Sequence, residues 1–149
     1  MKIIYGTPKD IDLWMHLVNL VKWNFPGLET AKSLEEHKKI VLEFMEKRQA
    51  ICVKENETIA GLMLFSRSHN MICFLAVAPK YRRKGIASKL SEKALEELDR
   101  NKAITVTTFR EDDEKGKAPR ALYKKFGFSE GELKVEFDYP NQEFILKLL

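Results

Sequence analysis

The most informative hydrophobic pattern lies at residues 71–78, where every position is apolar. A run without polar alternation predicts a strand that is covered on both faces, and therefore one at the centre of a sheet. Pro79 cannot donate to a strand ladder and ends this strand. Apolar residues then recur at helical spacing from Ile86 to Leu98, which predicts a helix that ends at Arg100 and Asn101. The basic segment before Ile86 therefore leads into the first turn of a helix.

The rest of the pattern predicts strands and helices along the whole chain. A Ser or Thr followed three residues later by an acid predicts helix starts at Thr7 and Ser33. A further short helix is expected to begin at Pro119 and to end at Gly127. Strands are expected at residues 1–5, 50–54, 59–68, 103–109, 133–139 and 143–149.

Two hairpins complete this outline. Residues 55–58 form the expected turn of the first, and Pro140–Asn141 that of the second. The strand at residues 133–139 alternates apolar and charged positions, which predicts an antiparallel strand with one buried and one wet face.

Composition and charge narrow the class of protein. The chain has 149 residues, 44% hydrophobic and 32% charged, with a formal net charge of +4, values that fit one domain spanning residues 1–149. This charge is too small to indicate nucleic-acid binding without a clustered patch. No apolar run is long enough for a membrane span or a secretory signal, so we expect a cytoplasmic protein. The two cysteines, Cys52 and Cys73, lie in apolar contexts where a free thiol behaves as a small hydrophobic residue, so we expect neither a disulfide nor a metal site. The histidines lack ligand spacing, and we expect surface or hydrogen-bonded roles for all three: His16, His37 and His69.

The helix turn after Gly85 is suited to bind an anion. Free backbone N–H groups and the positive end of the helix dipole lie there. Gly85 and Ala87 let a phosphate approach the backbone, and three basic residues add positive charge: Arg82, Arg83 and Lys84. A diphosphate fits this arrangement, although the segment matches neither a nucleotide-hydrolase loop nor Gly-x-Gly-x-x-Gly. The alternative is a solvated basic turn before an ordinary amphipathic helix.

Two short motifs make the chain resemble the GNAT superfamily of acyl-CoA-dependent N-acetyltransferases. The family's pyrophosphate loop, Gln/Arg-x-x-Gly-x-Gly/Ala, is matched by Arg82, Gly85 and Ala87, after a Val-x-Pro matched at residues 77–79. A second motif, Leu-Tyr-x-Lys-x-Gly-Phe, is matched at residues 122–128. The resemblance covers nearly the whole chain and implies an α/β (α+β) fold. This fold is a mixed, mostly antiparallel sheet of about seven strands with a splayed central pair, flanked by about four helices.

The resemblance also implies a reaction. Such an enzyme moves the acetyl group of acetyl-CoA to a primary amine, of a small molecule or of a peptide or protein, by direct attack in a ternary complex. Acetyl-CoA would be the co-substrate, without a metal. We expect no nucleic-acid or membrane partner, and a monomer or a homodimer.

Site residues follow from the same resemblance. The loop residues Arg82, Arg83, Lys84, Gly85, Ile86 and Ala87 would bind the pyrophosphate, and the backbone of Leu75, Ala76 and Val77 would pair with the pantetheine arm. The N–H of Leu75 would meet the developing oxyanion. Tyr123 matches the tyrosine that protonates the leaving thiolate and contacts the cofactor, a role that suits a phenol protonated at neutral pH. Its alternative role is a helix tyrosine packed by its ring.

Two features depart from the family pattern. The loop at residues 110–117 holds no Asn to contact pantetheine. Possible replacements are Arg110, Lys117 and Arg120. The central strand holds no carboxylate to act as a general base; the other acids considered are Glu29, Glu111 and Asp112.

The resemblance also implies an acceptor site, formed between the first two helices and at residues 139–142. There Trp23, Phe25 and Glu29 would form an aromatic pocket with one acid, which suits a small organic cation. The alternative is that these residues only close the core. The alternative function is a catalytically idle CoA-binding sensor or interaction module. RNA binding through residues 82–84 ranks last, because no aromatic residues are interleaved there.

Overall fold

A computed structural model describes residues 1–147 of the chain. Its strands are β1 (Ile3–Tyr5), β2 (Ala50–Glu55), β3 (Thr58–Ser66), β4 (Met71–Val77), β5 (Ile104–Phe109), β6 (Ser129–Glu136) and β7 (Tyr139–Leu146). Its α-helices are α1 (Ile11–Val21), α2 (Ala31–Glu46), α3 (Ile86–Glu97) and α4 (Lys117–Lys125). Short 3-10 turns lie at residues 8–10, 22–24, 79–81 and 114–116. The predicted order of elements is confirmed, and the part of the last predicted strand at residues 148–149 lies outside the described residues.

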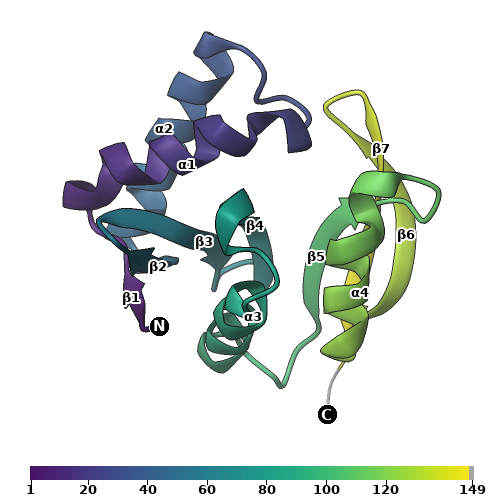
Figure 1. The fold of residues 1–149 in the computed structure, drawn as a ribbon. Coiled ribbons are helices and arrows are strands. Elements are labelled where there is room, and N and C mark those ends of the chain that lie inside the picture. The colour runs from purple at the N-terminus through teal and green to yellow at the C-terminus, as the bar shows by residue number, and fades with distance from the viewer. Residues whose placement is uncertain (148–149) are drawn as a thin grey trace.

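All seven strands form one sheet in the order β1-β2-β3-β4-β5-β7-β6. Neighbouring strands are antiparallel except β4 and β5, which are parallel and share a single register pair, Met71 with Thr105. Beyond that pair the two strands diverge, and the sheet opens into two parts (Figure 1). This is the splayed central pair expected from the resemblance, and it confirms the predicted fold class.

Asn70 holds the closed end of this opening. Its side chain is buried, its Nδ2 donates to the carbonyls of Asp99 at 2.9 Å and Ala103 at 3.0 Å, and its Oδ1 accepts the N–H of Asp99 at 2.8 Å. The Asn70 carbonyl also accepts the N–H of Thr105 at 3.3 Å. The start of β4 is thereby tied to the segment that enters β5, so the strands separate from a fixed point.

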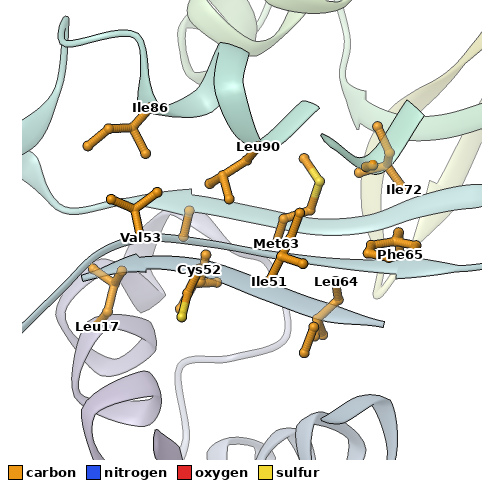
Figure 2. Packing of buried hydrophobic residues seen from close by; sticks show 14 of the residues in the cluster. Leu17, Ile51, Cys52, Val53, Met63, Leu64, Phe65, Ile72, Ile86 and Leu90 are labelled. Carbon is orange, nitrogen blue, oxygen red and sulfur yellow. The ribbon is translucent and has the colours of Figure 1, made fainter. Parts of the chain in front are cut away.

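The main core lies on both faces of β2 and β3. Helix α3 places Ile86 and Leu90 over one face, while α1 places Leu17 against the other (Figure 2). Each such side chain contributes about 1.5–3 kcal/mol when fully buried. Gly61 allows α3 to approach, because a Cβ at Gly61 would lie 2.5 Å from Ile86 Cγ2. The first turn of α3 is therefore fixed against the sheet.

Some predicted boundaries are wrong, and the capping contacts show why. Helix α2 begins two residues before Ser33, because Thr30 is its N-cap: Thr30 Oγ1 accepts the N–H of Ser33 at 3.0 Å, and Ser33 Oγ accepts that of Thr30 at 3.2 Å. The start near Thr7 is confirmed, since Asp10 accepts the N–H of Thr7 at 2.9 Å. Helix α3 ends at Glu97, short of the predicted Arg100.

The turn predicted at Pro140–Asn141 is also wrong. The β6–β7 hairpin turns at Phe137 and Asp138, with φ of 55° and 57°, the conformation of a tight two-residue hairpin turn. The expected buried face of β6 is exposed instead: Leu133 is 57% and Val135 64% exposed. The strand β6 is at the end of the sheet, which leaves these side chains uncovered in the single chain.

Candidate active site

The divergence of β4 and β5 opens a cavity of about 980 Å³. Its walls come from β4, the first turn of α3, β5, α4, the segment between α1 and α2, the inner face of α2, and the β6–β7 hairpin. This volume is at the upper end of the range for small-molecule and cofactor sites. The cavity therefore has room for an extended ligand.

One edge of β4 faces this cavity without a partner strand. Leu75, Ala76 and Val77 pair with β3 on one side, but the only register pair with β5 on the other side is at Met71. Each backbone N–H and C=O needs a partner when water is excluded. An extended ligand laid along β4 would supply those partners, as an added strand would.

Cys73 shows that β4 is not covered on both faces as predicted. The register shifts between Leu64 and Phe65, so Cys73 has no opposite residue on β3, and it is exposed in the cavity wall. Loss of water around its sulfur still raises the pKa of the thiol to about 11. Cys52 is buried as expected, and burial raises its pKa to about 12.

The N-terminus of α3 opens onto the cavity. Gly85 is its N-cap in the left-handed conformation, with φ of 76°, and no side chain within residues 1–147 caps the helix. Arg82, Arg83, Gly85, Ile86 and Ala87 all line the cavity. A Cβ at Gly85 would meet no atom within 4 Å, so space for a ligand lies directly above the backbone. Lys84 is not among the residues that line the cavity; its ammonium lies 5.7 Å from the ring centroid of Tyr81.

Tyr123 lines the cavity from α4. The residue is 4% exposed, and its ring lies 5.7 Å from that of Phe128 and 6.3 Å from that of Phe144. Burial raises the pKa of the phenol above its ordinary value, so Tyr123 keeps its proton at neutral pH. Both suggested roles, proton donor and packed ring, are compatible with this position.

A buried charged group fixes α4 to the sheet. Arg120 is 5% exposed, and its Nη1 donates to the carbonyl of Phe109 at 2.9 Å and to Gln142 Oε1 at 2.8 Å. Glu130 lies 3.2 Å from its Nη2. Because these contacts join α4 to β5, β6 and β7, they set the position of Tyr123.

The residues considered as replacements for the missing Asn lie in different places. Arg110 donates to the carbonyls of Asn141 at 3.1 Å and Lys134 at 2.9 Å, and Arg120 is engaged as just described. Lys117 lines the cavity.

Aromatic rings line the end of the cavity next to the segment between α1 and α2. Phe25 stacks on Phe74 of β4 with ring centroids 4.3 Å apart, and both line the cavity. The structure does not bring Trp23 and Glu29 to this wall: Trp23 is 65% exposed, and Glu29 accepts the N–H of Gly27 at 3.1 Å. The acids Glu111 and Asp112 are exposed and also lie outside the lining.

Two contacts close this end across the opening. A Cβ at Gly27 would lie 3.1 Å from the ring of Phe137, so the β6–β7 turn reaches the segment between α1 and α2. Lys115 Nζ donates to the carbonyl of Trp23 at 3.3 Å. These contacts connect the two sides of the opening at this end of the cavity.

His37 is the cavity residue that sequence reasoning missed. A surface or hydrogen-bonded role was expected, but its half-buried ring lies 4.8 Å from that of Phe74, and its buried Nε2 has no hydrogen-bond partner within residues 1–147. Burial lowers its pKa to about 4, so the imidazole is neutral at pH 7. The available signal was helical spacing, because His37 precedes Val41 by four residues and Phe44 by seven on the inner face of α2.

The chain matches the model of the acetyltransferase (GNAT) family over residues 14–128. A GNAT-family acetyltransferase from Bacillus cereus ATCC 10987 has 19% identity, covers 99% of this chain and 97% of its own, and superposes with a TM-score of 0.76. PaiA N-acetyltransferase from Thermoplasma acidophilum, solved in complex with coenzyme A, has 15% identity. The match covers 95% of this chain and 96% of the PaiA chain, with a TM-score of 0.68. A ribosomal-protein-alanine N-acetyltransferase from Brucella melitensis has 17% identity, full coverage of both chains, and a TM-score of 0.73. No curated protein matches the chain significantly.

The chain therefore belongs to the GNAT acetyltransferases, a family of acetyl-CoA-dependent acyltransferases. The solved structures share its fold at identities of 15–19%. Within residues 1–147, none of the helices is both long and apolar enough to cross a bilayer.

Proposed function

We propose that this protein transfers the acetyl group of acetyl-CoA to a primary amine, by direct attack of the amine on the thioester. The observation that carries the proposal is that one cavity joins three features: the uncapped N-terminus of α3, the unpaired edge of β4, and Tyr123. The family uses acetyl-CoA, and the Thermoplasma acidophilum protein of the same fold was crystallised with coenzyme A.

In the proposed complex the diphosphate lies at the α3 N-terminus. The free N–H groups of its first turn and the positive end of the helix dipole would bind the phosphates, with Arg82 and Arg83 beside them. The pantetheine arm would extend along Leu75, Ala76 and Val77. This places the thioester between β4 and α4.

The reaction then needs a hydrogen-bond donor for the developing oxyanion and a general acid for the leaving thiolate. The amine nitrogen forms a bond to the carbonyl carbon, and the carbonyl oxygen gains charge that the Leu75 N–H would stabilise. The C–S bond breaks, and Tyr123 gives its proton to the departing thiolate. The nitrogen loses one proton, which replaces that of Tyr123 by way of solvent, so the products are an amide and free coenzyme A.

The binding half of this proposal is tested by calorimetry with coenzyme A. Gly85→Val should weaken binding at least tenfold, because a branched side chain would occupy the space above the loop and strain a residue with φ of 76°. Gly127→Ala is the matched control: Gly127 also has a positive φ, 95°, but does not line the cavity. Unchanged affinity in a folded Gly85→Val variant would refute the assignment.

The catalytic half is tested by coenzyme A release from acetyl-CoA with polyamines, aminoglycosides, amino acids, peptides and simple monoamines. Turnover with any amine class supports the enzyme. No turnover together with tight coenzyme A binding would instead support an idle CoA-binding module.

A further inference from the structure

A lysine on α4 reaches across the open sheet to the first turn of α3. The two helices lie on opposite sides of the opening (Figure 1). Lys125 Nζ donates to Ser88 Oγ at 3.3 Å, and Ser88 is the third residue of α3. Of the side-chain hydrogen bonds within residues 1–147, this is the one that joins α3 to α4. Lys125 is exposed and Ser88 half-buried, so a ligand in the opening has access to both.

The contact places a positive charge beside the proposed diphosphate site. The free N–H groups of a helix belong to its first residues, which here are Ile86, Ala87 and Ser88, and all three line the cavity. An anion that accepts from these N–H groups would lie next to Ser88. A lysine carries its rotatable donors on a flexible four-carbon stem. Its ammonium can therefore exchange the Ser88 hydroxyl for a phosphate oxygen.

Lys125 is also free of a carboxylate partner. Its neighbour Lys124 is exposed too but forms an ion pair with Glu130 at 2.8 Å, whereas Lys125 forms none in the part of the chain that the structure describes. The Lys125 ammonium otherwise lies 5.9 Å from the ring centroid of Phe126. Binding of a phosphate by Lys125 would thus break no existing ion pair, and the attraction between the two charges is not offset by such a loss.

We propose that Lys125 is a ligand of the cofactor diphosphate, which it approaches from the side of the opening opposite to Arg82 and Arg83. This inference rests on the cofactor site of the proposed function and adds to it a residue from the second part of the sheet. Helix α3 packs on β3 and β4, and α4 packs on β5, so the bound phosphates would connect the two parts. Lys125 follows Tyr123 by two residues, so the same contact would position the helix that carries the proposed acid.

The adjacent lysines offer matched variants for calorimetry with coenzyme A. Lys125→Met removes the charge and keeps an unbranched side chain, Lys125→Arg keeps the charge, and Lys124→Met removes an equal charge one position away. Affinity should fall about five- to tenfold in Lys125→Met, as expected for one solvent-exposed contact between charged groups, and should barely change in the other two. Without ligand, Lys125→Met should unfold at nearly the same urea concentration as the wild type.

A second ligand identifies the phosphate that Lys125 contacts. Dephospho-coenzyme A lacks the ribose phosphate but keeps the diphosphate, so Lys125→Met should weaken its binding by the same factor. Added salt should reduce the difference between wild type and variant, because an exposed contact is screened. The inference would be overturned by equal affinities of wild type and Lys125→Met, by an equal loss in Lys124→Met, or by a loss confined to coenzyme A.

This test and that of the proposed function fail in different ways. Binding is measured without an acceptor, so absence of turnover with every amine leaves the result for Lys125 standing. If the wild type binds coenzyme A and Lys125→Met binds it equally well, only the role of Lys125 is refuted. If the wild type does not bind coenzyme A, the proposed function and the inference are both wrong.

Discussion

The two parts of the open sheet are built differently. The part formed by β1–β4 is packed by α1, α2 and α3 and contains most of the buried apolar side chains. The part formed by β5–β7 is packed by α4 alone, with Arg120 and Gln142 buried in its centre and Leu133 and Val135 exposed at its edge. The first part supplies the α3 N-terminus and the open edge of β4 that we propose bind the cofactor, and the second holds Tyr123 by polar contacts. We therefore expect loss of the Tyr123 proton to alter turnover, and loss of a buried polar contact to lower stability more in the second part than in the first.

Tyr123→Phe should give the largest effect. The substitution keeps the ring between Phe128 and Phe144 and removes only the proton, so kcat should fall about ten- to a thousandfold while coenzyme A affinity and Tm barely change. Steady-state kinetics and calorimetry on the same sample measure both. Lost stability with retained turnover would show that the ring or a structural contact is what matters.

Arg120→Met should have the next largest effect, on the free energy of unfolding. It tests whether polar contacts stabilise the second part. It leaves the carbonyl of Phe109 and the amide of Gln142 without their partner, which should lower the free energy of unfolding by about 2–3 kcal/mol. Lys124→Met is the matched control, because Lys124 also pairs with Glu130, at 2.8 Å, but is exposed and should contribute at most about 1 kcal/mol. Urea unfolding measures the difference; equal effects in the two variants would contradict this account.

Asp10→Asn, a substitution in the first part, should have the smallest effect on stability. Burial alone would raise the pKa of Asp10, but hydrogen bonds from Lys54 and from the Thr7 backbone outweigh burial and lower it. A carboxyl whose pKa is lower in the folded than in the unfolded chain stabilises the fold above its ordinary pKa of about 3.9, and this contribution is lost as the pH falls through the folded value. The variant should thus lose at most about 1 kcal/mol at pH 7 and less at pH 3, as expected for a partly exposed ion pair. A Tm difference that is the same at both pH values would argue against the ion pair.

The order of elements and the basic turn before α3 could be predicted because their signals are local. Helical spacing, caps and the apolar run at residues 71–78 each depend on neighbours in the sequence. The turn at Phe137–Asp138 was missed because two non-glycine residues adopt positive φ there, beside the stronger turn signal of Pro140. The unpaired Cys73 and the half-buried His37 were missed for another reason: the first depends on the register of β4 against β3, and the second on how α2 packs against Phe74 of β4, and no local pattern records either.

The exposed thiol of Cys73 affects how this protein can be assayed. Because Cys73 lies in the wall of the proposed cofactor cavity, reagents that detect free coenzyme A by its thiol will also titrate the protein. The pKa near 11 keeps little thiolate at neutral pH, so this background should grow slowly and rise with alkalinity. The same reactivity is useful, because a bound cofactor would shield the sulfur, and the alkylation rate of Cys73 would report occupancy without any acceptor amine.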